Sequence, residues 1–335
     1  MPDNHKRRFV TSAEEDIISN LPEHLIDQIL YRLLTEDAVR TSVLSKKWRY
    51  RWTTMSTLNL RDQFIKKLSK IGALAHNGFI RVINQIMIHH NGPVLKFVLC
   101  IPNIVLHNFQ EVDQWMLILS RNGVRKLIIL NWNRIYPIPS SVFSCLELRT
   151  LRLYNCIFKP PLEFQGFLNL EDIHLKSVYF GDNLGGNMIN LPCLKKLTLD
   201  ECDNVNNFNI KAEKLQSLKV YLCPDTMLLR LFHSEHLHVG HEADLELTSN
   251  YLESPDCLNQ TLFMLQTVKM TSLEGSRPEL LFIKLLLDHS PHLENIIIRP
   301  RSTADAQKVL NIAKAVMLFP RASANAKMVY LDPQP

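Results

Sequence analysis

The sequence predicts an α/β protein with three parts: an N-terminal unit of three short helices, a short, irregular solenoid with a parallel sheet, and a C-terminal α/β cap. Three observations predict this architecture. Apolar residues near the N-terminus recur at helical spacing, a leucine pattern repeats roughly every 23 residues, and strand and helix patterns alternate towards the C-terminus. With 335 residues and 46% hydrophobic content, the chain suits two or three folded units rather than a disordered polymer.

The helical unit is expected over residues 16–60, after a disordered tail at 1–15. Pro22 opens the first helix, because a proline loses no hydrogen bond in a first helical turn. The apolar stripe of this helix consists of Leu25, Ile26, Ile29, Leu30 and Leu33. Thr35 is expected to cap a second helix, and Ser45 a third helix on which Trp48 and Trp52 share one face. Three short helices cannot bury this much apolar side chain, so the unit is either a docking module or a helical cap on the solenoid.

The pattern L-x-x-L-x-L, with aliphatic substitutions, recurs through the middle of the chain. Its clear copies begin at Val124, Leu148, Leu170, Leu194 and Leu215, and weaker copies begin at Val94, Leu265 and Leu293. This period and signature are those of the leucine-rich repeat. Each copy is expected to form a strand whose leucines point inward and whose intervening residues point outward. Residues 61–261 are therefore expected to form an open arc with a shallow face that suits a protein or peptide.

The cysteines and histidines raise the question of a metal site. Seven cysteines without a CxxC pair indicate free thiols in a reducing compartment. Cys156, Cys202 and Cys223 each follow the first leucine of a repeat by eight residues, which predicts a structural ladder rather than a metal cluster. A second group consists of His233, His236, His238 and His241. These histidines are expected to lie on an irregular strand, so no metal or other cofactor is predicted.

The order of residues in the helical unit is more specific than its periodicity. The runs N-L-P-x-x-L-x-x-x-I-L and A-V-R-T-S-V-L-S-K-K-W-R closely resemble the F-box of plant F-box proteins that carry leucine-rich repeats. The resemblance implies binding to a Skp-family adaptor. The motif positions, expected to bind the adaptor, are Leu21, Pro22, Leu25, Ile29, Leu30, Val39, Ser42, Val43, Leu44 and Trp48. The family usually has Leu-Pro where this chain has Leu33–Leu34, and the missing proline is expected to let the first helix extend by about one residue.

The C-terminal part, residues 262–335, alternates strand, helix, strand, helix and strand. Ser276 and Pro278 predict the start of its first helix. Its closing run F-P-R-A-S-x-x-A-x-x-x-Y-L-D resembles the FBD domain of plant F-box proteins with leucine-rich repeats. We expect this part to cover the last open edge of the repeat sheet, which would otherwise expose unpaired backbone groups.

Charge and motifs exclude several function classes. The net charge of +5 is spread along the chain without a dense basic stripe, so nucleic-acid binding is not expected. No apolar run is long enough to predict a membrane span, and the N-terminus lacks the apolar core of a secretory signal. The sequence contains no phosphate-binding glycine loop, G-x-S-x-G or H-E-x-x-H motif, so the chain is expected not to be an enzyme.

The resemblance implies the substrate-recognition subunit of an SCF (Skp–cullin–F-box) ubiquitin ligase, joined through its adaptor to cullin and RING subunits. Its compartment would be the cytoplasm, the nucleus or both. The outward repeat residues expected to bind an unknown protein substrate are Arg149, Arg152, Glu171, His174, Lys196 and Lys219. Two alternatives remain: an adaptor-bound interaction scaffold without a degradation substrate, and a nucleic-acid-binding repeat protein.

Overall fold

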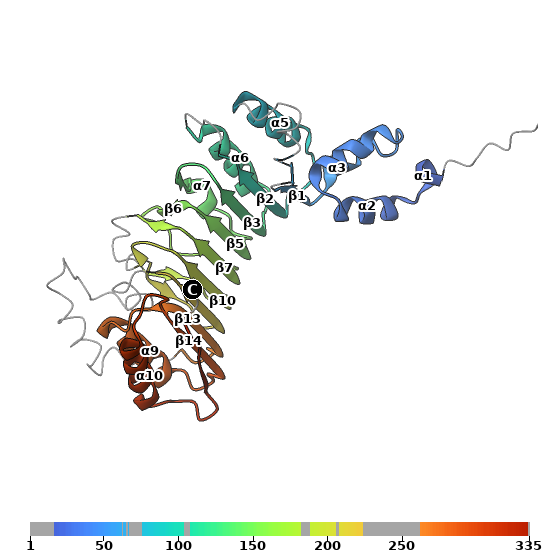
Figure 1. Ribbon diagram of the computed structural model, residues 1–335. Helices are drawn as coiled ribbons and strands as arrows, with labels where there is room; N and C mark the ends of the chain where they lie inside the picture. Colours follow the sequence, from blue (N-terminus) through green and yellow to red (C-terminus); the bar gives the residue numbers. More distant parts are fainter. Residues whose placement is uncertain are drawn as a thin grey trace, which may run out of the picture.

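The computed structural model describes residues 17–61, 63–64, 66, 76–103, 108–181, 188–205, 208–223 and 262–333. Its centre is a ten-stranded parallel sheet with the order β1-β2-β3-β5-β7-β10-β12-β13-β14-β15. The strands are β1 (Thr57–Leu60), β2 (Lys96–Ile101), β3 (Lys126–Asn131), β5 (Thr150–Tyr154), β7 (Asp172–Lys176), β10 (Lys196–Asp200), β12 (Ser217–Tyr221), β13 (Thr267–Leu273), β14 (Asn295–Pro300) and β15 (Lys327–Tyr330). They line the inner side of an open arc (Figure 1).

Every predicted repeat contributes one strand to this sheet, so the interpretation as leucine-rich repeats is confirmed. Burial alternates along the middle strands. In β5, for example, Leu151 and Leu153 are buried, whereas Thr150, Arg152 and Tyr154 are only half-buried. Strand pairing keeps equivalent positions in register, so the inward leucines of all repeats form one continuous core. The sequence analysis did not predict β1, although its residues alternate in the same way.

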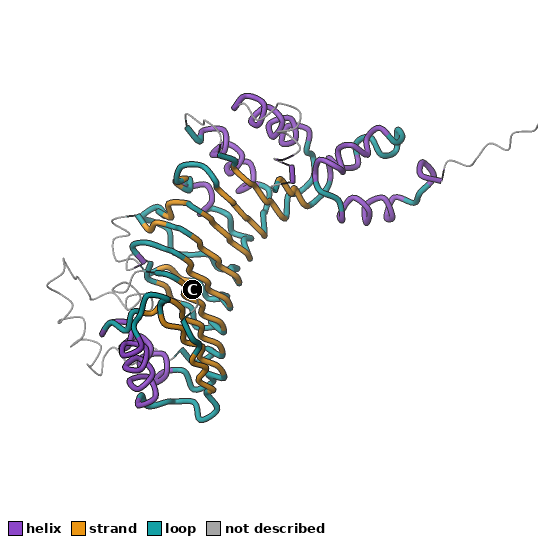
Figure 2. The backbone as a smooth tube through the Cα atoms, in the orientation of Figure 1, coloured by secondary structure: helices purple, strands orange, loops and turns teal. Residues whose placement is uncertain are grey.

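The outer side of the arc changes along the chain (Figure 2). The first repeats carry helices there: α5 (His76–His89), α6 (Gln110–Arg121) and the short α7 (Ser140–Phe143). The middle repeats replace them with loops and short strands: β4 (Tyr136–Pro137), β6 (Cys156–Phe158), β8 (Tyr179–Phe180), β9 (Ile189–Asn190) and β11 (Ile210–Lys211). This variation makes the solenoid irregular, as predicted.

The N-terminal unit projects beyond the β1 edge of the sheet (Figure 1). It contains α1 (Ile17–Asn20), α2 (Glu23–Arg32), α3 (Thr35–Arg40) and two 3₁₀-helices, Thr41–Val43 and Arg51–Thr54. The predicted third helix is therefore a series of turns ending in a 3₁₀-helix. Ser45 does not cap it, because its hydroxyl makes no hydrogen bond within the described residues. Its carbonyl instead accepts the backbone N–H groups of Trp48 and Arg49.

The first long helix does not extend at Leu34, which corrects our expectation. Helix α2 ends at Arg32, and both following residues are extended, with φ −84° and ψ 155° at Leu33 and φ −69° and ψ 153° at Leu34. Leu34 thus has the backbone geometry of a proline although it is a leucine. Packing accounts for this, because Leu33 lies against the hydrophobic core and turns the chain into α3.

The helical unit is bonded directly to the sheet. Thr35 begins α3 but does not cap it; its hydroxyl accepts a 2.6 Å hydrogen bond from the backbone N–H of Asn59 in β1. The carbonyl of Thr53 accepts the N–H groups of Asn91 and Gly92, which precede β2. A Cβ on Gly92 would lie 2.8 Å from the backbone of Thr54. A side-chain hydroxyl and a backbone carbonyl thus bind the unit to the first repeat.

The C-terminal part continues the repeat sheet. Strands β13, β14 and β15 alternate with α9 (Arg277–His289) and α10 (Ala306–Leu318), as predicted. Ser276 and Glu279 form a capping box at the start of α9. This part covers the edge left by the repeats, as expected, because β13 pairs with β12. It adds three strands, and the four-residue β15, which pairs only with β14 among the described strands, forms the new edge.

Several predictions fall outside the described residues. They include the tail at 1–15 and the group formed by His233, His236, His238 and His241. Among the helices that are described, none combines the length and the apolar character needed to cross a membrane.

Candidate interaction surfaces

The apolar residues of the helical unit divide into a buried and an exposed set. Leu30 and Trp48 are 1% and 2% exposed and form part of the core. Val43 is 87% exposed, Leu44 47% and Ile29 40%. The remaining predicted positions are half-buried, apart from the exposed Pro22: Leu21, Leu25, Val39 and Ser42. The structure thus brings only some of the predicted adaptor residues to the surface.

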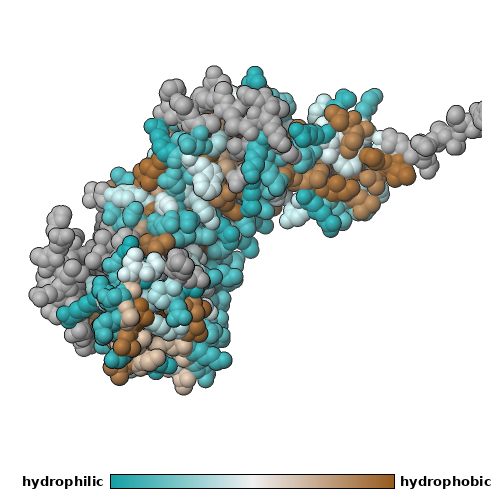
Figure 3. Space-filling model, in the orientation of Figure 1, coloured by the Kyte–Doolittle hydropathy of each residue, from teal (hydrophilic) through white to brown (hydrophobic). Residues whose placement is uncertain are grey.

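Helix α2 explains the division. Pro22, Leu25 and Ile29 follow one another at helical spacing on its outer face, whereas Ile26 and Leu30 point into the unit. Figure 3 shows hydrophobic residues gathered over these helices. The exposed apolar residues that the sequence analysis did not select are Ile17, Ile18, Tyr31 and Tyr50. We define the apolar docking surface as Ile17, Ile18, Pro22, Leu25, Ile29, Tyr31, Val43, Leu44 and Tyr50.

Polar contacts hold this surface in place from behind. The indole N–H of Trp48 donates a 3.0 Å hydrogen bond to the carbonyl of Ile18. The Lys47 ammonium donates to the carbonyl of Leu21. The turns after α3 are therefore tied to the segment before α2. Trp48 itself is buried, but its hydrogen bond holds the segment that carries the exposed Ile18.

The second surface is the concave face, which consists of the residues of the ten-stranded sheet that point away from the leucine core. Its basic residues outnumber the acidic ones: the cations are Lys96, Lys126, Arg152, Lys176, Lys196, Lys219, Lys269, Arg299 and Lys327. The acidic residues on these strands are Asp172 and Asp200. All six predicted substrate residues lie on this face or at the strand starts that border it: Arg149, Arg152, Glu171, His174, Lys196 and Lys219.

Ion pairs concentrate in the middle of the concave face. Arg152 contacts Asp172 of the next strand at 2.8 Å, and Lys176 contacts Asp200 at the same distance. At the start of the strands, Glu171 lies 2.8 Å from Lys195 and 3.8 Å from Arg149. His174 lies among these charges. Burial lowers its pKa, and the Arg152 charge acts in the same direction.

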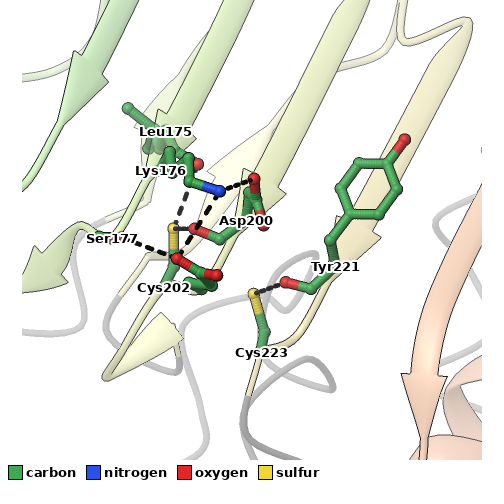
Figure 4. A network of polar contacts seen from close by, with 8 residues as sticks. Leu175, Lys176, Ser177, Asp200, Cys202, Tyr221 and Cys223 are labelled. Carbon is green, nitrogen blue, oxygen red and sulfur yellow. Dashed lines mark hydrogen bonds and ion pairs between the residues drawn. The ribbon is translucent and has the colours of Figure 1, made fainter. Parts of the chain in front are cut away.

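The cysteines behind the strand ends are structural. The thiols of Cys156, Cys202 and Cys223 each lie 3.3–3.5 Å from the carbonyl oxygen two residues earlier. Figure 4 shows this contact at Cys202 and Cys223, next to the pair of Lys176 and Asp200. Burial raises the pKa of the Cys156 thiol, which disfavours the thiolate that a metal would need. No group of three or more potential metal ligands occurs among the described residues.

Comparison with known proteins agrees with this architecture. A family model of the F-box domain matches residues 18–59, and a model of the At1g61320/AtMIF1 leucine-rich-repeat domain matches residues 86–236. The helical unit is thus an F-box, and the chain is an F-box protein with leucine-rich repeats.

Relatives give the family. F-box/FBD/LRR-repeat protein At1g13570 of Arabidopsis thaliana is 32% identical over 250 residues, which cover 70% of this chain and 58% of the relative. F-box/FBD/LRR-repeat proteins At5g56420 and At5g53840 of the same plant are 28% and 25% identical, over 62% and 75% of this chain. The chain spans 49% and 59% of their lengths. It belongs to the plant F-box/FBD/LRR-repeat protein family.

Proposed function

We propose that this chain is the substrate-recognition subunit of an SCF-type ubiquitin ligase, acting in the cytoplasm, the nucleus or both. Its F-box would bind a Skp-family adaptor and, through it, the cullin and RING subunits. Its concave face would hold a protein substrate. The chain would supply no catalytic group; it would raise the local concentration of substrate lysines near the conjugating enzyme.

The observation that carries this proposal is the apolar docking surface. The F-box exposes Val43, Leu44 and Ile29, although burying apolar side chains lowers the free energy of the protein. Contiguous exposed apolar residues mark interaction sites. All residues of this surface except Ile17 also lie within residues 18–59, which the F-box model matches.

We also propose the division into a tail at 1–15, the F-box at 16–60, repeats at 61–261 and an FBD domain at 262–335. The capping box of α9 and the order β13-α9-β14-α10-β15 support a separate sequence unit at the C-terminus. Pairing of β12 with β13 continues the sheet across the boundary, so this domain would fold against the repeats rather than independently.

The adaptor assignment is tested by charged substitutions on the docking surface. The double variant Val43→Asp/Leu44→Asp should abolish co-purification with a Skp-family adaptor, because buried interface anchors contribute roughly 2 kcal/mol or more each. Its folding should be unaffected, since both side chains face solvent in the free protein. Leu146→Asp is the matched control, because Leu146 is 75% exposed but lies on a repeat loop. An adaptor complex that survives the double variant would exclude this surface.

The scaffold alternative is tested by the fate of bound proteins. A substrate receptor should increase the ubiquitination of a partner in a reconstituted ligase, and the Val43→Asp/Leu44→Asp variant should not. A partner that binds the concave face but is never ubiquitinated would favour the scaffold.

A further inference from the structure

Two pairs of lysines on the concave face lie directly opposite one another. In the strand register, Lys96 of β2 faces Lys126 of β3, and Lys219 of β12 faces Lys269 of β13. Like charges at opposite positions of neighbouring strands destabilise a sheet. These two lysine pairs therefore do not stabilise the sheet, and we consider binding of a partner as their role.

Neither pair is neutralised within the described residues. No carboxylate there lies within ion-pair distance of any of the four lysines, whereas Arg152 and Lys176 between them each have an aspartate partner at 2.8 Å. The ammonium group of Lys269 lies over the ring of Tyr221, 5.3 Å from its centre. Burial lowers the pKa of Lys126, and the charges of Arg152 and Lys96 add to this effect, while the Asp172 carboxylate opposes it.

The concave face thus carries two positive patches, the Lys96–Lys126 patch and the Lys219–Lys269 patch. The section between them on β5, β7 and β10 is more nearly balanced, because Arg152 and Lys176 pair with Asp172 and Asp200, and Lys196 adds one further positive charge. Acidic groups on a partner would gain most at the two ends and little in the middle, where two of the three cations already have a carboxylate partner. Complementarity therefore requires a partner with two separate acidic groups.

The sheet fixes the distance between the groups. Five strand spacings separate the centres of the two patches, and at about 4.8 Å each they span roughly 24 Å. An extended peptide advances about 3.3 Å per residue, so about seven residues cover this span.

We propose that the concave face binds an extended substrate segment with two clusters of aspartate or glutamate about seven residues apart and uncharged residues between them. The proposal rests on the proposed function of the concave face as the substrate surface. It names the class of segment that this surface selects: a bipartite acidic peptide.

The test uses the purified chain with its adaptor and three labelled peptides of 14 residues. The first has two Asp-Glu pairs centred seven residues apart in a glycine, serine and asparagine background. The second has the same composition with the four acidic residues contiguous in the middle, and the third has none. Fluorescence anisotropy at low salt should show the first peptide binding about tenfold more tightly than the second, because the second can reach only one patch.

Charge reversal should remove this preference. Lys96→Glu/Lys126→Glu and Lys219→Glu/Lys269→Glu should each weaken the first peptide at least tenfold, and the corresponding glutamine variants should weaken it less. Lys308→Glu/Lys314→Glu is the matched control, because it makes the same charge change on the exposed surface of α10. Equal binding of the first two peptides, or equal loss in the control, would mean nonspecific attraction and overturn the proposal.

Adaptor co-purification is measured in parallel, because it depends on the apolar docking surface alone. Absence of peptide selectivity in the unsubstituted chain, with the adaptor still bound, would refute the bipartite segment and leave the F-box assignment standing. Selective binding of the first peptide by a chain that fails to bind adaptor would refute the ligase role instead.

Discussion

Replacing Leu34 with proline should stabilise this protein, although proline usually disrupts helical units. Leu34 already has φ −69°, within the range that a proline ring imposes, and the preceding Leu33 is extended, as a residue before proline prefers to be. The backbone N–H of Leu34 donates no hydrogen bond within the described residues. Proline would therefore remove no bond and strain no dihedral angle.

The gain would come from the unfolded state. Proline restricts the unfolded chain and so reduces the entropy lost on folding, by about 0.4–1 kcal/mol at a compatible site. For a chain of this length we expect the unfolding midpoint to rise by about 0.5–1.5 °C. The half-buried Leu34 side chain is not among the residues packed on the core, so its removal should offset little of this gain.

Thermal unfolding followed by tryptophan fluorescence measures the effect, because Trp48 and Trp52 both lie in the F-box. Leu33→Pro is the control. The N–H of Leu33 donates a 3.0 Å bond to the carbonyl of Leu30, and its side chain packs on the core. The free energy of unfolding of this variant should be lower by about 3 kcal/mol. If Leu34→Pro destabilises the protein as much as Leu33→Pro, the α2–α3 connection is not proline-like.

Three further perturbations have defined outcomes. Gly166→Ala should strongly destabilise the repeats, because Gly166 has φ +137° and its new Cβ would lie 1.8 Å from the carbonyl oxygen of Asn190; urea unfolding would show a lower midpoint. Ser276→Ala should cost about 1 kcal/mol by removing the capping box of α9, measurable in the same assay. Burial lowers the pKa of His90, whose ring contacts the carbonyl of Met55 at 2.8 Å. The unfolded state therefore takes up a proton on His90 at a higher pH than the folded state does. The stability that neutral His90 contributes is complete above about pH 6.5 and is lost as the pH falls through the lower pKa of the folded state. The His90→Gln variant should show a smaller fall in midpoint between pH 7.5 and 5.5.

The repeat strands could be predicted from the sequence because their signal is local. Alternation such as Leu151 and Leu153 around Arg152 assigns each side chain to one face of a strand, and the period between copies sets the stacking. The same holds for the start of α9, where Ser276 and Glu279 lie three residues apart. Such features involve neighbours within a few residues of one another, so a single sequence contains them.

The exposed part of the F-box surface required the tertiary structure. Ile29 and Leu30 are adjacent, apolar and both in the family motif, yet one is 40% exposed and the other 1%. Helical spacing places Ile29 and Leu30 on different faces of α2. Which of these faces is buried depends on how α2 packs against the turns after α3. The end of α2 before Leu34 depended on the same packing rather than on the absence of a proline.

The sequence by itself therefore determined the class of fold, the F-box motif and the position of nearly every strand of the ten-stranded sheet. The tertiary structure decided which charged side chains of the concave face lie next to one another. Lys176 and Lys219 occupy strand positions of the same kind, yet Lys176 has a carboxylate partner at 2.8 Å and Lys219 faces another lysine. Their neighbours come from the adjacent strands of other repeats, more than 20 residues away in the chain. Only the register of the stacked strands specifies which of these distant residues meet.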